Sequence, residues 1–220
     1  MAFHLIQNSS RALLSPAAAD VAAVAPAQRA VEILGPDYLR WSRLGMGALG
    51  FVGALVGASG PGAIVDAVAS GQPPVVVAFA AIMGVLLIAV LALSVWLLVS
   101  LAVSGSRLVR SLASWLGGPY RSGQLAASWS GWLHTRLLLF RLPVFTRIAA
   151  ASCAALFAVY AVYAFISSLA VPSANAVVYA CWAAVAIATS VCLFSGSIRL
   201  ISGRAEADRV WRSVRDGSFR

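Results

Sequence analysis

Few side chains in this sequence could take part in chemistry, and they lie far apart. The two histidines, His4 and His134, have no carboxylate near them in the sequence. Cys153, Cys181 and Cys192 each stand in an apolar run without a Cys-x-x-Cys pair, so we interpret them as small core residues. The spacing matches no metal site, phosphate loop or nucleophile elbow. We therefore predict a protein that is not an enzyme and that uses no metal or cofactor.

Asp66 is the one candidate for a polar site within the apolar part of the chain, because no other acid lies between Asp37 and Glu206. A carboxylate inside lipid usually serves proton transfer or ion binding. Asp66 lies 23 residues after Arg43, which is about 34 Å of helix at about 1.5 Å per residue. The hydrocarbon core is only about 30 Å thick. We therefore expect Asp66 in water at the far interface, with a proton or ion site as the alternative.

The composition is that of an integral membrane protein. Of 220 residues, 61% are hydrophobic and 10% are charged, whereas a soluble domain is about 45–50% apolar and about 25% charged. The chain has sixteen arginines, no lysine and a net charge of +9. The placement of this charge follows membrane orientation, so we predict no nucleic-acid partner.

Four apolar runs are long enough to cross a bilayer. They form two predicted hairpins, residues 44–103 and residues 148–198, with turns at residues 71–74 and 171–175. The predicted fold class is therefore an all-α integral membrane protein with four transmembrane helices arranged as two hairpins. Pro61 should kink the first span rather than end it.

Before the first span, two short helices are expected. Pro26 begins one that Gly35 closes, and Pro36 begins the next. We expect no cleaved secretory signal, since residues 1–14 lack a basic start and a long apolar region.

Glycines of the first span recur on one helical face, which predicts close packing against another helix. The common alternative is that glycine is simply frequent in membrane helices. The four positions are Gly50, Gly53, Gly57 and Gly60.

Residues 104–147 carry six arginines, three tryptophans and no acid. Two amphipathic patterns, residues 106–116 and residues 125–140, are separated by Gly117-Gly118-Pro119. We predict two helices that lie in the membrane plane as a basic interfacial shelf, or alternatively a docking surface for a partner subunit. The side chains expected at this lipid or partner interface are Arg107, Arg110, Trp115, Arg121, Trp129, Trp132 and Arg136.

Arginine placement also predicts the topology. Residues 1–43 hold four arginines, the shelf six and residues 199–220 six, while both hairpin turns hold none. The positive-inside rule then places both termini in the cytoplasm, with residues 1–43 as an amphipathic segment and residues 199–220 as a basic helix. The predicted location is the inner (cytoplasmic) membrane of a bacterium.

A short sequence repeat suggests how the two hairpins are related. Residues 104–106 and residues 195–197 both read Ser-Gly-Ser, each at the end of a hairpin. A duplication in the same orientation would explain this, and a chance match of small residues is the alternative.

The first functional hypothesis is a non-catalytic membrane subunit that scaffolds a larger complex of secretion, conjugation or energy-transducing type. Its expected partners are lipids and other membrane subunits, in a homo- or hetero-oligomer. The layout of two hairpins around a basic shelf is similar to that of reticulon-type membrane-shaping proteins, which implies membrane bending as an alternative. A small oligomeric channel or permease, with Asp66 at the mouth of a glycine-lined seam, is the third.

Overall fold

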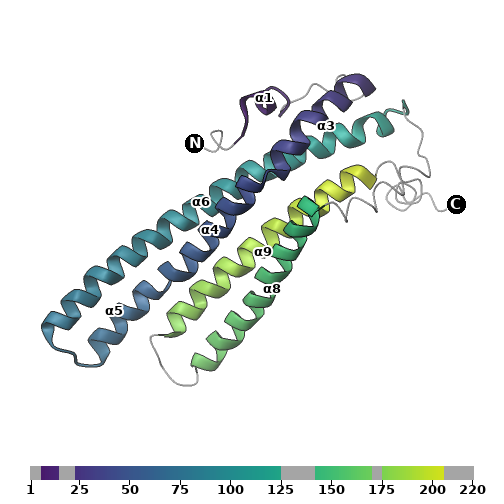
Figure 1. Cartoon of the computed structure of the whole chain (residues 1–220). Helices are drawn as coiled ribbons and strands as arrows, with labels where there is room; N and C mark the ends of the chain where they lie inside the picture. The colour runs from purple at the N-terminus through teal and green to yellow at the C-terminus, as the bar shows by residue number, and fades with distance from the viewer. Residues whose placement is uncertain (1–5, 15–22, 125–141, 170–174, 206–220) are drawn as a thin grey trace. The chain divides into compact units, whose positions relative to one another are not determined.

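The computed structural model describes residues 6–14, 23–124, 142–169 and 175–205. Every regular element in these ranges is an α-helix (Figure 1). The helices are α1 (Asn8–Arg11), α3 (Val24–Leu39), α4 (Trp41–Gly57), α5 (Ser59–Ala69), α6 (Pro74–Arg121), α8 (Leu142–Leu169) and α9 (Asn175–Ala205). Four helical stretches are long and apolar enough to cross a membrane: Val24–Ala69, Pro74–Arg121, Val144–Leu169 and Asn175–Leu200. The predictions of an all-α protein and of four candidate spans are confirmed.

The chain divides into two compact units. We call the first the basic unit; it consists of the described parts of Met1–Arg43, Ser100–Ile148 and Leu193–Arg220. The second, the apolar unit, consists of the described parts of Leu44–Val99 and Ala149–Cys192. Every arginine in the described residues belongs to the basic unit, and Asp66 is the one charged residue in the sequence of the apolar unit.

In the apolar unit, α4 and α5 lie along the first part of α6 (Figure 1). The glycine face is the contact surface. A Cβ atom added to Gly57 would lie 2.5 Å from the backbone N of Leu91, and one added to Gly60 would lie 2.7 Å from the carbonyl oxygen of Gly84. Close backbone approach of this kind requires residues without a side chain. Gly50 and Gly53 face α6 in the same way, toward Leu98 and Ser94.

Aromatic side chains tie α4 to α8 and α9 within the same unit. Phe157 on α8 lies 6.1 Å from Phe51 and 5.7 Å from Trp182, measured between ring centroids. The indole N–H of Trp182 donates to the carbonyl of Leu55 at 2.8 Å, which satisfies the polar end of an otherwise apolar side chain.

The interruption between α4 and α5 falls at Ala58, three residues before Pro61. Pro61 has no N–H, so the carbonyl of Gly57 lacks its usual helical donor. The Ser59 hydroxyl donates to the carbonyl of Val56 at 2.6 Å and satisfies one of the groups at this break. The chain then resumes as α5.

Two predicted helix boundaries are wrong. Gly35 does not end a helix, because α3 runs unbroken through Pro36 to Leu39. Pro36 deprives the carbonyl of Glu32 of its donor, but both residues are exposed, so solvent can replace the lost hydrogen bond. Burial of Leu34 and Tyr38 on either side of Pro36 holds the helix together.

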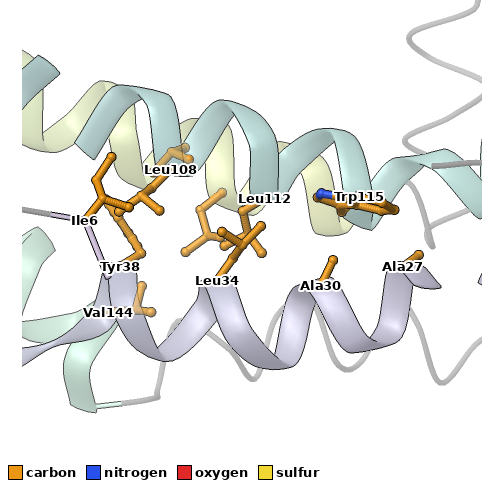
Figure 2. Close-up of a cluster of buried hydrophobic side chains, with 11 residues drawn as sticks. Ile6, Ala27, Ala30, Leu34, Tyr38, Leu108, Leu112, Trp115 and Val144 are labelled. Atoms are coloured by element: carbon orange, nitrogen blue, oxygen red, sulfur yellow. The ribbon is translucent and has the colours of Figure 1, made fainter. Parts of the chain in front are cut away.

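Gly117-Gly118-Pro119 does not break a helix either. α6 continues through these residues to Arg121, so residues 106–116 are the extension of the second span and not a separate helix. The reason is that Leu108, Leu112 and Trp115, the apolar face of the predicted shelf, bury against α3 within the chain (Figure 2). The second amphipathic pattern, residues 125–140, lies outside the described residues.

The cysteines also differ from the interpretation as core residues. Cys153 and Cys192 are exposed and Cys181 is partly buried. A thiol behaves as a small apolar group, so an apolar helix tolerates it on an outward face as readily as in a core.

Candidate functional site

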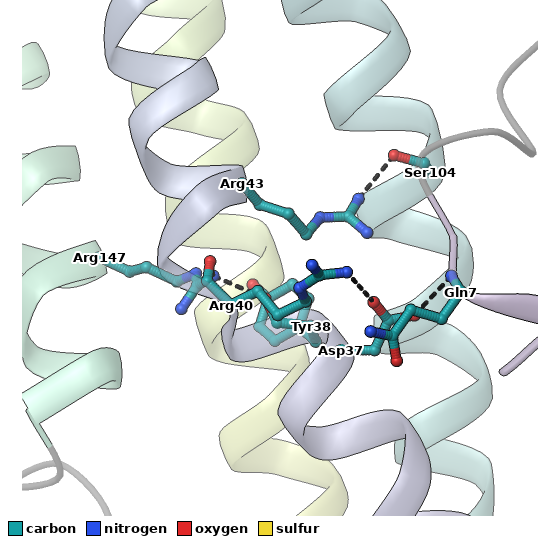
Figure 3. Close-up of polar contacts among 7 residues, drawn as sticks. All are labelled: Gln7, Asp37, Tyr38, Arg40, Arg43, Ser104 and Arg147. Atoms are coloured by element: carbon teal, nitrogen blue, oxygen red, sulfur yellow. Dashed lines mark hydrogen bonds and ion pairs between the residues drawn. The ribbon is translucent and has the colours of Figure 1, made fainter. Parts of the chain in front are cut away.

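The buried charged side chains of the described residues, Asp37, Arg43 and Arg147, gather where α3 gives way to α4. We call this cluster the polar junction; it belongs entirely to the basic unit (Figure 3). Its members are Gln7, Asp37, Tyr38, Arg40, Arg43, Ser104 and Arg147.

The junction begins with the end of a helix. α3 ends at Leu39, and Arg40 takes an extended conformation with φ −56° and ψ 133° before α4 begins at Trp41. The last carbonyls of an α-helix have no partner within the helix and must find other donors. The carbonyl of Arg40 accepts a hydrogen bond from the backbone N–H of Arg43 at 3.3 Å, and the Tyr38 carbonyl is one of the last carbonyls of α3.

Arg147, in the first turns of α8, supplies the missing donor. Its Nη2 atom donates to the carbonyl of Tyr38 at 2.6 Å and to that of Arg40 at 3.4 Å. The guanidinium also lies over the Tyr38 ring, 4.8 Å from the centroid. A cation at a helix C-terminus is stabilised by the helix dipole, and the ring face adds a cation–π contribution. Arg147 is only 6% exposed because these three groups replace its water.

Arg43 makes a second tie, from the start of α4 to α6. It is 8% exposed, and its Nη2 atom donates to the Ser104 hydroxyl at 2.6 Å. The hydroxyl in turn donates to the carbonyl of Leu101 at 3.1 Å. Ser104 therefore bridges a buried cation and its own helix.

Asp37 is the carboxylate of the junction and is fully buried. Its Oδ2 atom accepts a hydrogen bond from the backbone N–H of Gln7 at 3.1 Å. Its Oδ1 atom lies 4.0 Å from Nη1 of Arg40, whose side chain is 48% exposed, and has no hydrogen bond. This ion pair is therefore long and open to solvent on one side, and such pairs contribute little to stability.

Both Ser-Gly-Ser motifs contact this junction. Ser104 accepts from Arg43, and a Cβ atom on Gly105 would lie 3.9 Å from the guanidinium of Arg43. A Cβ atom on Gly196 would lie 2.8 Å from the Tyr38 hydroxyl oxygen. The small residues of the two motifs thus let α6 and α9 approach the same short segment of the chain.

The chemistry of the junction is that of attachment between helices. The hydrogen bonds of Arg43 and Arg147 described above end on a hydroxyl and on carbonyl oxygens of the protein itself. In the part of the chain that the structure describes, no group of three His, Cys, Asp or Glu side chains could hold a metal ion.

The structure places the sequence-predicted interface residues in different settings. Arg107, Arg110 and Arg121 are exposed on α6, and Nη2 of Arg121 donates to the carbonyl of Ser114 at 3.3 Å. Trp115 does not lie at a lipid or partner interface: it is 3% exposed, in the core of the basic unit. The remaining predicted residues, Trp129, Trp132 and Arg136, lie outside the described residues.

Asp66 is exposed on α5. Within the described part of the chain its carboxylate makes no hydrogen bond or ion pair, and its backbone carbonyl accepts from the Ser70 hydroxyl at 2.7 Å. The sequence did not identify Asp37, Arg43, Ser104 or Arg147 as a cluster. The available signal was that Arg43 and Arg147 each directly precede an apolar run, but the sequence cannot show which distant groups they bind.

Replacing Ser104 by Ala tests the tie from Arg43. Loss of a hydrogen bond to a buried charged group should lower the free energy of unfolding by about 1.5–3 kcal/mol. Ser106→Ala is the matched control, because the Ser106 hydroxyl also donates to a carbonyl of its own helix, that of Val103 at 2.9 Å, and makes no hydrogen bond to another described helix. The control should change stability by less than about 0.5 kcal/mol. Equal effects of the two substitutions, measured by unfolding in mixed micelles, would contradict the assigned role of Ser104.

Comparison of the chain with protein-family models, with curated proteins and with solved structures gives no match, so the function has to be argued from the structure of this chain.

Proposed function

We propose that this chain is a non-catalytic subunit of a bacterial inner-membrane complex, with both termini in the cytoplasm and with the basic unit as its docking surface for other subunits. The observation that carries the proposal is the gathering of the basic segments. The described parts of residues 1–43, 100–148 and 193–220 form one compact unit that holds every described arginine. Two hairpins between three basic segments require those segments to lie on one side of the membrane, and arginine favours the cytoplasmic side.

The length of α6 supports a protein partner over lipid alone. Residues 75–99 of α6 are about 37 Å of helix and are long enough for the hydrocarbon core of about 30 Å. Residues 100–121 continue the same helix for about another 33 Å. Charges are screened over about 8–10 Å at physiological salt. A helix that continued upright over this length would carry Arg121 beyond the reach of lipid head groups, where an acidic protein surface is the more effective partner.

The buried polar junction supports a structural role. Its charged groups hold α3, α4, α6 and α8 together, from Arg43 to Ser104 and from Arg147 to the end of α3. A subunit that presents a fixed surface to partners needs such ties, because a rigid surface loses less conformational entropy on binding.

The two alternative functions, membrane bending and a small channel or permease, have less support. Membrane bending relied on two in-plane helices, and residues 106–116 instead extend the second span and pack on α3. A channel relied on an open glycine seam, but α6 fills the space opposite Gly53 and Gly57, with the Ser94 hydroxyl 2.5 Å from a Cβ atom placed on Gly53.

Gentle extraction tests the proposal. Purification in a mild detergent, followed by native mass spectrometry, should give an assembly heavier than the 22.8 kDa chain. Arg110→Gln should reduce retention of the partner, because it removes an exposed charge of the basic unit. Arg110→Lys keeps the positive charge, so this variant should still retain the partner. A monodisperse 22.8 kDa monomer, with no co-purifying protein, would contradict the proposal.

A further inference from the structure

The polar junction lies at the depth of the lipid head groups, given the predicted spans. Arg40 comes four residues before Leu44, where the first predicted span begins. Arg147 directly precedes the third predicted span, which begins at Ile148. Four residues of helix are about 6 Å long at about 1.5 Å per residue. The head-group layer is about 5–8 Å thick on each side of the hydrocarbon core, so Arg40 lies in the layer that holds the lipid phosphates.

Arg40 is the exposed arginine of the junction. Its side chain is 48% exposed, and its Nη1 atom lies 4.0 Å from the Asp37 carboxylate, which is too long for a hydrogen bond. Within the described part of the chain, the Arg40 guanidinium donates no hydrogen bond. A planar guanidinium can give two parallel hydrogen bonds to one phosphate group. Arg40 can therefore bind a phosphate without giving up a hydrogen bond to the described chain.

Two buried arginines set the sign of the electrostatic potential at this place. Arg43 is close enough to Arg40 and Arg147 for their charges to act on it. The hydroxyl and carbonyl oxygens that bind Arg43 and Arg147 in Figure 3 are neutral groups. Among the residues of the junction, three are arginines and one, Asp37, is a carboxylate. The potential at Arg40 is therefore positive and favours a ligand of net negative charge over a zwitterion.

Exposed aromatic side chains stand next to these arginines in the sequence. Trp41, which follows Arg40, is 55% exposed, and Phe145, two residues before Arg147, is 58% exposed. Both belong to the basic unit. Tryptophan prefers the boundary between head groups and hydrocarbon. A phospholipid offers a phosphate to the arginine and an apolar chain to the rings, whereas an acidic protein loop or a free anion offers the charge alone.

We propose that the polar junction binds the phosphate of an anionic phospholipid, with Arg40 as the direct contact and with Trp41 and Phe145 against the acyl chains. Arg43 and Arg147 act through their charge and do not have to touch the lipid. Anionic lipids of the cytoplasmic leaflet supply such a head group. This inference goes beyond the scaffold function, because the lipid binds the single chain and requires no partner subunit.

Lipid titration of the purified full chain tests the site. The chain is freed of lipid in a neutral detergent and titrated with phosphatidylglycerol, which is anionic, or with phosphatidylcholine of the same acyl chains, which is zwitterionic. Native mass spectrometry counts the bound lipids, and phosphatidylglycerol should bind more tightly. Arg40→Gln should weaken its binding about fivefold, as expected for the loss of one basic residue beside an anionic lipid. Arg40→Lys keeps the charge without the paired donors, so its affinity should fall between wild type and Arg40→Gln.

Arg29→Gln is the matched control, because Arg29 is also exposed and lies on α3. The substitution removes the same charge 11 residues before Arg40. That distance is about 16 Å of helix, beyond the screening length of about 8–10 Å at physiological salt. Arg29→Gln should therefore bind phosphatidylglycerol as wild type does. Without lipid, Arg40→Gln should unfold at the same denaturant concentration as wild type, because the ion pair that it loses is long and open to solvent.

Three results would overturn the proposal. The first is equal affinity for the two lipids, or an equal loss of affinity in Arg40→Gln and Arg29→Gln. The second is displacement of phosphatidylglycerol by millimolar inorganic phosphate, which would show that the site takes a free anion. The third is loss of a co-purifying protein from Arg40→Gln with unchanged affinity for lipid, which would show that Arg40 binds an acidic protein surface.

Discussion

Replacing Gly57 by Leu should separate α4 from α6 and lower the free energy of unfolding by about 1–3 kcal/mol or more. Even a Cβ atom at this position would lie 2.5 Å from the backbone N and 2.8 Å from the Cα of Leu91. Those are backbone atoms, which cannot turn aside as a flexible side chain can. The two helices must therefore move apart and lose contacts along their length, since packing is the main attraction between helices in lipid.

Gly47→Leu is the matched control on the same helix. A Cβ atom at Gly47 meets nothing within 4 Å. Replacing a helical glycine at an open position by a residue with a better helix propensity should be neutral or stabilising by about 0.5–1 kcal/mol. Unfolding in nanodiscs or mixed micelles measures both variants. If Gly57→Leu is as stable as Gly47→Leu, then Gly57 does not lie at the contact with α6.

Replacing Arg147 by Met should also be strongly destabilising. The substitution removes the donor to the carbonyls of Tyr38 and Arg40 and the cation above the Tyr38 ring. Loss of a buried hydrogen bond from a charged group should lower the free energy of unfolding by about 1.5–3 kcal/mol. The end of α3 should loosen first, because it is the element that the guanidinium caps.

Two further substitutions separate capping from charge. Arg147→Lys keeps the positive charge and therefore its contribution to membrane orientation. The lysine ammonium, however, lacks the planar set of hydrogen-bond donors of the guanidinium. The stability of this variant should fall between wild type and Arg147→Met. Arg110→Met removes an exposed arginine on α6 and should change stability by less than about 0.5 kcal/mol. Equal losses of unfolding free energy in Arg147→Met and Arg110→Met would show that the buried hydrogen bonds of Arg147 have no structural role.

Structural features that depend on composition and on local sequence pattern could be predicted from the sequence. The all-helical fold and four candidate spans follow from hydrophobic runs long enough to cross a bilayer. The turn between the first two spans was also found: α5 ends at Ala69 and α6 begins at Pro74. Such features are set by residues close in sequence, so the sequence reveals them directly.

Features that depend on distant contacts were not predictable in this way. Gly35-Pro36 and Gly117-Gly118-Pro119 are strong breaking signals, yet burial of Leu34 in one case and of Trp115 in the other outweighs them. The sequence shows the amphipathic face of residues 106–116 and predicts lipid or a partner subunit against it, whereas in the structure this face packs on α3. Periodicity shows that a face is apolar and does not show what covers it.

The polar junction was missed for the same reason. Arg43 and Arg147 looked like charges that orient the spans, while their hydrogen-bond partners lie 61 and 109 residues away. Only the folded chain brings Ser104 to the first arginine and the Tyr38 carbonyl to the second.

The central claim is that the basic segments share the cytoplasmic side of the membrane, and cysteine labelling in intact cells tests it most directly. In a cysteine-free background, single cysteines would replace Asn8, Gln72 and Gln124, which are all exposed. A membrane-impermeant maleimide should label the Gln72→Cys chain from outside, and should label the other two only after the membrane is permeabilised. Labelling of Asn8→Cys or Gln124→Cys in intact cells would contradict the topology and the docking role proposed for the basic unit.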